Sequence, residues 1–246
     1  MARDSRELGG AWTRFQRHGF LAPAPELARW VERYWVVSWR YREPYRQKIV
    51  PYPNVHLTFG DGTATVTGVA TRFTTRVLAG NSGVFGVAFR PGCFRPFLGG
   101  PVSALTDRVV DAGEIFRDLP AEPGRDAVEA FLHTHLPASD PAAFEAADIV
   151  ATIAEHPELT RVDDLARRCG TSVRQLQRLF AEYVGVGPKW VIRRYRLREV
   201  TARLESGAPV DWAALAADLG YADQAHFARD FKDLFGEPPT AYAQRY

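Results

Sequence analysis

Apolar residues change their spacing near the middle of the 246-residue chain. Up to about residue 90, short runs of β-branched and aromatic residues alternate with turn residues, which is typical of antiparallel strands. The predicted strands are 34–39, 56–59, 63–70, 72–78 and 84–89, with a hairpin turn at Gly60-Asp61-Gly62. Beyond residue 120, apolar residues recur at helical spacing, first over 125–136 and 141–156. The pattern predicts an α+β chain, in which an antiparallel β-rich domain (a cupin-like barrel or a sandwich) precedes an all-α domain.

The helical domain contains two units of the same design, each a short helix, a tight turn and a second helix. In the first unit, Gly170 ends the short helix, and Ser172 caps the next with Gln175 at capping-box spacing. In the second unit, Gly220 and Asp223 take the same places. We expect the units at about 162–183 and 211–235, with a linker helix at about 188–206 between them. These are two helix-turn-helix units, a geometry that places each second helix in the major groove of DNA.

The domain limits follow from this pattern. Residues 1–120 are expected to form the β-rich regulatory domain, 121–147 a helical linker, and 148–246 the domain with both helix-turn-helix units.

Each second helix carries polar side chains on the face opposite its apolar stripe. Arg174, Gln177 and Arg178 form one ridge, and Gln224 and Arg229 lie on the other helix. Arg can pair bidentately with guanine and Gln with adenine, so these are candidate base-reading residues. The alternative is a solvated helix face, and repetition of the ridge in both units argues against it.

The linker helix sets the separation of the two units. About 18 residues at 1.5 Å each give a rod of roughly 27 Å, close to one DNA turn of roughly 34 Å. Some of its arginines should meet phosphates and others should pair with carboxylates. The candidate phosphate contacts are Ser172, Lys189, Arg193, Arg194 and Lys232.

Charge is divided unevenly along a chain whose net charge is only +2. Residues 167–203 carry ten basic and two acidic side chains, whereas residues 205–246 carry three basic and seven acidic ones. Because phosphate contacts supply most of the affinity for DNA, the first unit and the linker helix should dominate binding.

Composition argues against a disulfide-stabilised, metal-binding, catalytic or membrane-spanning protein. Two cysteines and six scattered histidines give neither a disulfide framework nor a zinc set, and His133 and His135 would diverge on a helix. No catalytic motif is visible, so we expect no enzyme, no cofactor and no metal site. The chain lacks an 18-residue apolar run, and its start lacks the apolar core of a signal peptide. We expect a cytoplasmic, nucleoid-associated protein without a membrane partner.

The β-rich domain offers candidates for an effector pocket. Aromatic residues could line a small-molecule cavity in a barrel mouth, or they could simply fill the core. A single strand histidine could bind a ligand or be structural. The candidate pocket residues are Trp35, His56, Phe59, Phe85 and Phe89.

At this point the chain resembles a known family. Residues from about 148 onward are similar to the DNA-binding domain of AraC/XylS-type transcription regulators. In the first unit the resemblance is carried by Leu165-Ala166, Gly170, Ser172, Leu176–Phe180, Gly185 and Gly187-Pro188. In the second unit it is carried by Leu215-Ala216, Gly220, Phe227, Arg229, Phe231-Lys232, Phe235-Gly236, Pro239 and Tyr242. The segment GVAFRPG, residues 86–92, resembles the N-terminal domain of some actinobacterial members.

The resemblance implies a sequence-specific transcription regulator with two DNA-reading helices. It places base-reading positions at Arg174, Gln177, Arg178, Gln224, Ala225 and Arg229. Ala225 departs from the polar residue that the family often has there, which implies weaker readout. Such regulators bind a DNA operator, and they respond to a small-molecule effector, form homodimers or contact RNA polymerase. The alternative is a DNA-binding regulator whose N-terminal half is a dimerisation or protein-interaction module without a ligand.

Overall fold

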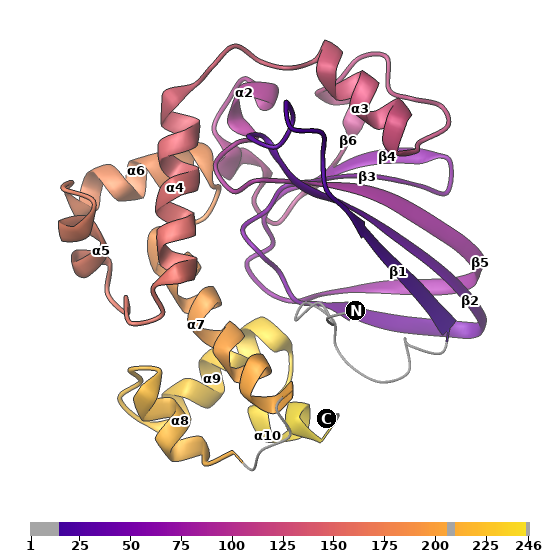
Figure 1. Cartoon of the computed structure of the whole chain (residues 1–246). Coiled ribbons are helices and arrows are strands. Elements are labelled where there is room, and N and C mark those ends of the chain that lie inside the picture. The colour runs from indigo at the N-terminus through magenta and orange to yellow at the C-terminus, as the bar shows by residue number, and fades with distance from the viewer. Residues whose placement is uncertain (1–14, 206–209, 245–246) are drawn as a thin grey trace.

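The computed structural model describes residues 15–205 and 210–244, in an N-terminal sheet and a C-terminal set of helices (Figure 1). The strands are β1 (Gln16–Leu21), β2 (Val31–Ile49), β3 (His56–Gly60), β4 (Thr63–Thr67), β5 (Thr74–Phe89) and β6 (Val109–Asp111). They form one antiparallel sheet in the order β1-β2-β5-β3-β4-β6. The predicted α+β class with an antiparallel β-rich first half is therefore confirmed.

The hairpin between β3 and β4 forms where the turn residues predict it. Asp61 and Gly62 both have positive φ, 52° and 74°, which is the geometry of a two-residue hairpin turn. Aspartate and glycine tolerate this region of backbone space better than most residues do.

Two strands are longer than the sequence pattern predicts. β2 continues to Ile49 through the polar segment 40–48, and β5 joins the two predicted strands 72–78 and 84–89 into one. The register shifts between Tyr41 and Tyr45, opposite Gly80, whose φ is +65°. The glycine-rich segment therefore marks a bend in a continuous strand, and a β-bulge bends its partner at the same point.

At this bend the β2–β5 ribbon folds back on itself. Figure 1 shows it running away from the helices, turning at its far end and returning beneath its own first part. We call residues 31–39 and 82–89 the first limb, and residues 45–49 and 74–78 the return limb. The return limb ends beside the C-terminal helices.

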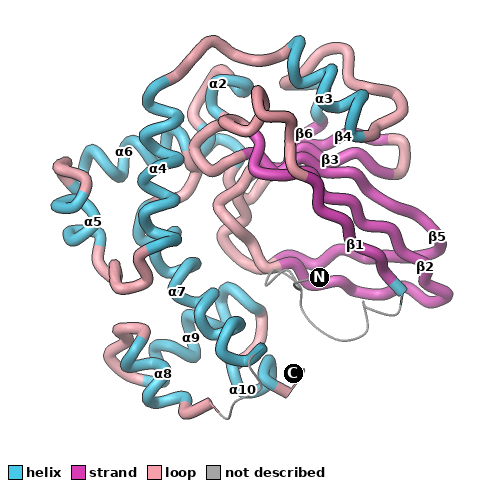
Figure 2. The backbone as a smooth tube through the Cα atoms, viewed as in Figure 1, coloured by secondary structure: helices cyan, strands magenta, loops and turns pink. Residues whose placement is uncertain are grey.

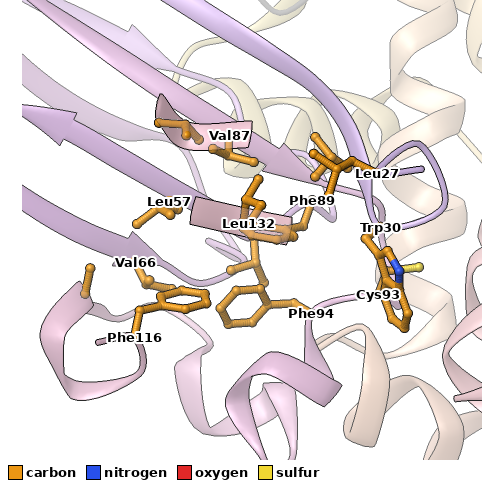
Figure 3. Packing of buried hydrophobic residues seen from close by; sticks show 14 of the residues in the cluster. Leu27, Trp30, Leu57, Val66, Val87, Phe89, Cys93, Phe94, Phe116 and Leu132 are labelled. Atoms are coloured by element: carbon orange, nitrogen blue, oxygen red, sulfur yellow. The ribbon is translucent and has the colours of Figure 1, made fainter. Parts of the chain in front are cut away.

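One face of the sheet is covered by the connecting helices. These are α2 (Arg95–Leu98), the 3-10 helices Val102–Leu105 and Ala112–Glu114, and α3 (Arg125–Thr134). Val87 and Phe89 of β5 pack there against Phe94, Phe116 and Leu132 (Figure 3). All five side chains are at most 3% exposed, so this face is the core of the N-terminal domain.

The C-terminal half is all helical, as Figure 2 shows. Its helices are α4 (Pro141–Glu155), α5 (Val162–Arg168), α6 (Val173–Tyr183), α7 (Pro188–Glu205), α8 (Trp212–Asp218), α9 (Gln224–Phe235) and α10 (Pro239–Ala243). One core joins α4 to α5 and α6, and another lies among α7, α8, α9 and α10. The last residue of the predicted linker helix, at position 206, lies outside the described residues.

Candidate nucleic-acid interface and effector cavity

The two helix-turn-helix units are built on the same backbone plan. In α5–α6 the turn begins at Gly170, with φ +63°, and in α8–α9 it begins at Gly220, with φ +70°. The following residue donates its N–H to a carbonyl five residues back in both turns, Thr171 to Ala166 and Tyr221 to Ala216. This helix ending satisfies carbonyls of the last turn and requires a left-handed residue, which glycine adopts without steric cost.

The caps of both second helices form as predicted. Ser172 and Gln175 make a reciprocal capping box, with 3.2 Å from the Gln175 N–H to Ser172 Oγ and 3.0 Å from the Ser172 N–H to Gln175 Oε1. Asp223 Oδ1 accepts the backbone N–H of His226 at 2.6 Å. Both helices therefore begin at a defined residue, which fixes the angular position of every side chain that follows.

The sequence-predicted ridges lie on the outer faces of these helices. On α6, Leu176 and Phe180 are buried while Arg174, Gln177 and Arg178 are exposed. On α9, the phenylalanines and Leu234 are buried, and the exposed side chains include Gln224, Ala225 and Arg229. Each ridge points away from its own core, as a helix that reads base edges requires.

Helix α7 joins the two units. It has 18 residues, which at 1.5 Å each give a length of roughly 27 Å. Val191 packs in the core of the first unit, and Leu197, Val200 and Leu204 pack in that of the second. One helix thus belongs to both cores and sets the position of one ridge relative to the other.

The candidate phosphate contacts differ in their surroundings. Ser172, Lys189 and Lys232 are exposed. Arg193 is half-buried, with its Nε 3.2 Å from Asp230 Oδ2 and its Nη2 3.4 Å from Asp233 Oδ2. Two carboxylates of α9 therefore neutralise this arginine and tie α7 to α9.

Arg194 does not fit the predicted phosphate contact. Its side chain is 1% exposed, its Nε donates to the carbonyl of Pro51 at 2.5 Å, and its guanidinium lies 3.8 Å from the centroid of the Tyr52 ring. Consecutive residues of a helix point in different directions, so Arg194 faces the N-terminal domain although Arg193 precedes it directly. In this conformation Arg194 is a contact between domains and cannot reach a phosphate.

The second face of the sheet encloses a cavity of about 300 Å³ between the two limbs of the β2–β5 ribbon. Trp35, Val37 and Trp39 line it from the first part of β2, and Lys48 and Ile49 from the return limb. Its volume lies at the small end of the range of about 300–1,000 Å³ that is usual for ligand sites.

Among the predicted pocket residues, Trp35 and His56 line this cavity. Phe59, Phe85 and Phe89 lie instead in the core on the opposite face, at 3%, 7% and 0% exposed. Successive side chains of a strand point to opposite faces of the sheet. Aromatic residues that lie on opposite faces therefore cannot all line one cavity. The structure thus separates the proposed set into two groups.

Trp35 lies flat because of the residue that faces it across the sheet. Its register partner is Gly86, and a Cβ there would lie 2.0 Å from the indole ring. The indole Nε1 donates to His56 Nδ1 at 3.2 Å. Because the indole N–H can only donate, His56 accepts this hydrogen bond through Nδ1.

Most of the polar lining of the cavity is not among the residues predicted from the sequence. His18, Arg33, Lys48, Arg76 and Asn54 all contribute to it. Part of this lining could have been predicted from β2, where Arg33, Trp35 and Val37 alternate with core residues and so share one face of the sheet. The return limb gave no such signal, because its position depends on the bend.

The remaining candidate chemistry is sparse. Burial raises the pKa of the Cys93 thiol to about 12, the opposite of what a reactive thiol needs. Within residues 15–205 and 210–244, no group of three His, Cys, Asp or Glu side chains could hold a metal ion. The same described residues contain no helix with the length and apolar character needed to cross a bilayer.

A helix shared by two helix-turn-helix units, each with an exposed Arg/Gln ridge, defines a tandem helix-turn-helix domain of the DNA-binding class. Residues 165–245 match the family model described as "Helix-turn-helix domain", and residues 20–111 match "Domain of unknown function (DUF6597)". The chain thus carries a match to a helix-turn-helix domain in its C-terminal half and a match to the DUF6597 domain in its N-terminal half.

Part of the chain is similar in sequence to curated transcriptional regulators. The HTH-type transcriptional regulator GlxA of Rhizobium meliloti (strain 1021) is 35% identical over 127 residues, which are 51% of this chain. The chain spans 37% of the length of the curated relatives it matches. A transcriptional regulator from Chromobacterium violaceum with an AraC-type DNA-binding domain is 27% identical, with a TM-score of 0.36 over 39% of this chain and 88% of that one. ToxT from Vibrio cholerae is 10% identical, with a TM-score of 0.42 over 94% of this chain and 98% of that one.

Proposed function

We propose that the protein regulates transcription by binding a double-stranded DNA operator through the ridges of α6 and α9. The observation that carries this proposal is the equivalent placement of two exposed Arg/Gln ridges on equally capped helices joined by one shared helix. Recognition helices in tandem can read successive turns of the major groove when a rigid element fixes their spacing. Such a protein would act in the cytoplasm on the nucleoid.

Affinity and specificity come from different residues. Exposed cations such as Lys189 and Lys232 are placed for phosphates, and these contacts make binding strongly dependent on salt. The ridge residues discriminate between bases, at about 1–3 kcal/mol for each good bidentate pair.

We further propose that the DUF6597 domain binds a small effector in the cavity between its two limbs. The support is a concave, largely apolar lining with a few polar groups, which is the usual composition of a ligand site. The cavity belongs to the domain that contacts both helix-turn-helix units, so a bound molecule can influence both. Arg95 pairs with Glu182 of α6 at 2.8 Å, and Lys48 pairs with Glu237, beyond α9, at 3.0 Å.

A second reading makes the N-terminal half a dimerisation or protein-interaction module. It is favoured by apolar side chains on the edge strands, Phe20 and Leu21 on β1 at 38% each and Val109 on β6 at 64% exposed. Exposed apolar edges can pair with a second copy or with another protein such as RNA polymerase. Self-association of the ligand-free full chain in analytical ultracentrifugation, lost on Val109→Lys or Leu21→Lys, would support this reading.

The test of DNA binding is selection of bound duplexes from a random library, followed by substitution of one ridge residue. Arg178→Ala should weaken binding to the selected site by about 1–3 kcal/mol and relax base preference at one position. Arg198→Ala, which removes an exposed arginine of α7 outside the ridges, is the matched control and should leave the preference unchanged. A uniform loss across all sequences would assign Arg178 to phosphate, and failure to enrich any site would reject the proposed function.

A further inference from the structure

One segment of the N-terminal domain both lines the cavity and holds the second helix-turn-helix unit. Lys48, Val50, Pro51 and Tyr52 belong to the cavity lining. Lys48 Nζ lies 3.0 Å from Glu237 Oε1, and Val50 is part of the core of the second unit. Pro51 and Tyr52 are the residues that hold the buried guanidinium described above. We call this set of interactions the second-unit contact.

Further residues widen the second-unit contact. Lys48 Nζ lies 5.3 Å from the centroid of the Phe73 ring. Phe73 packs against Gly236, the left-handed residue that ends α9, where a Cβ would lie 2.8 Å from the ring. Trp190 of α7 donates through Nε1 to the carbonyl of Thr71 at 3.0 Å. The end of β2 and the start of β5 therefore meet α7 and the C-terminal end of α9 together.

Among the described residues, the charged side chains that line the cavity are all basic. Among the described lining residues the permanent cations are Arg33, Lys48 and Arg76, two histidines accompany them, and no Asp or Glu is present. Two carboxylates are bonded to lining residues from outside it, Glu32 to Asn54 at 2.7 Å and Glu237 to Lys48. A lining of this kind favours an anion.

The shape and size of the cavity limit the rest of the ligand. Trp35 lies flat over Gly86, and Trp39, 5% exposed, continues the same wall. Flat aromatic walls favour a flat ring by stacking. A volume of about 300 Å³ suits a ligand of one or two rings.

We propose that the cavity binds a small aromatic carboxylate, and that this carboxylate takes Lys48 from Glu237 and so loosens the second-unit contact. The proposal rests on the effector role given above to the DUF6597 domain. The exchange replaces one carboxylate by another on the same ammonium group, so the cation keeps a partner throughout. Glu237, 15% exposed at its side chain, then loses the ion pair that holds it against the N-terminal domain.

The second-unit contact is suited to such release because the buried guanidinium at its centre is incompletely hydrogen-bonded. Arg194 is buried with one hydrogen bond and a stacked ring, and among the described residues its Nη1 has no hydrogen-bond partner. Burying a guanidinium without full pairing is costly, so the docked state is less favourable than its buried area suggests. Loss of one neighbouring ion pair can therefore shift the balance toward separation.

The first experiment is calorimetric titration of the full chain with two carboxylates, benzoate and indole-3-carboxylate, and with their neutral amides, benzamide and indole-3-carboxamide. The carboxylates should bind about tenfold more tightly than the amides, and Lys48→Gln should abolish this difference. Glu237→Gln should tighten carboxylate binding about fivefold, because it removes the competitor for Lys48. The double variant should show no such gain. Glu199→Gln, which breaks the pair with Arg203 elsewhere on α7, is the matched control and should change nothing.

The second experiment measures amide hydrogen exchange in the same samples. Indole-3-carboxylate should speed exchange in residues 235–242, and Glu237→Gln should do so without ligand. Equal binding of carboxylates and amides, no binding at millimolar concentration, or slower exchange in 235–242 would each overturn the proposal. Binding of the selected duplex without ligand is measured separately, so a failure of DNA recognition is distinguishable from a failure of the effector mechanism.

Discussion

At the scale of single residues, the arginines and lysine of α7 show how surroundings decide a role. Lys189 is exposed at the start of the helix, whereas Arg194 is buried one turn later against Pro51 and Tyr52. Arg196 donates to the carbonyl of Leu219 and lies 4.3 Å from the centroid of the Tyr221 ring. The charge run therefore divides into exposed residues, which we propose contact DNA, and structural residues.

This division predicts opposite effects for two substitutions of the same kind. Arg194→Ala should lower the free energy of unfolding by about 2 kcal/mol, because a hydrogen bond from a charged group and a cation–π contact are lost. Lys189→Ala should change stability by less than about 0.5 kcal/mol but reduce the salt dependence of DNA binding by about one unit of slope. Urea titration and binding at several salt concentrations measure the two effects. A weaker salt dependence of DNA binding in Arg194→Ala would show that Arg194 contacts phosphate after all.

The Cys93 thiol provides a second prediction at this scale. Burial raises its pKa to about 12, so at pH 8 only roughly one thiol in ten thousand is ionised. The Cys169→Ser variant should therefore react with iodoacetamide at pH 8 only as fast as it unfolds, while Cys93→Ser, which keeps the partly exposed Cys169, should react faster. Mass spectrometry follows both reactions, and rapid native labelling of Cys93 would contradict its burial.

The pocket residues show what sequence can and cannot place at this scale. Trp35 and His56 were proposed together with three phenylalanines that lie on the other face of the sheet. Composition identifies the aromatic residues, but their positions along each strand decide to which face of the sheet they point. The register of β5 against β2, which relates the two strands, depends on the bulge. Lys48 could not be assigned to the cavity at all, because it reaches the site only through the bend of the ribbon.

At the scale of elements, helix ends were the most predictable features. The left-handed glycines and caps of both units occur at the expected residues, because these signals act within one turn of the chain. The extent of β2 and β5 was not predictable, since a polar segment pairs there only because a distant strand lies beside it. Local chemistry thus predicts helix boundaries, and long-range pairing decides strand length.

The capping residue Ser172 allows its structural and DNA-binding roles to be separated. Ser172→Ala should cost about 1 kcal/mol of stability, because the N–H of Gln175 loses its acceptor. Ser172→Asp should retain most of that stability, since Asp is an equally good cap, but it should weaken DNA binding by placing a negative charge near phosphate. Urea titration and duplex binding report the two roles. Undiminished DNA binding by Ser172→Asp would remove Ser172 from the phosphate contacts.

At the scale of the whole molecule, the two units differ in charge although they share a design. Residues 167–203 carry net +8, and the second unit lies in a segment of net −4. Arg193, which belongs to the basic segment, is engaged by Asp230 and Asp233 of α9, so part of this charge is already neutralised. The first unit still presents the more basic exposed surface.

We therefore expect the ridges to contribute unequally to DNA affinity. Alanine substitution of Arg174, Gln177 and Arg178 one at a time should cost more on average than substitution of Gln224 and Arg229, with single losses of about 1–3 kcal/mol on α6. Binding of each variant to the same selected duplex gives the comparison. Larger losses on α9 would show that the second unit leads recognition despite its net charge.

The bend in the β2–β5 ribbon has a consequence for how such a protein can diverge. The bend divides the cavity wall into two parts. The first part, Trp35 and Val37 on the first limb, only lines the cavity. The second part, Lys48 to Tyr52, also meets the second helix-turn-helix unit. Substitutions in the first part can alter which molecule fits while leaving the link to the helices intact. Substitutions in the second part change recognition and response at once. For the proposed effector site, new ligand preferences are therefore most accessible to evolution, and to engineering, through the first limb.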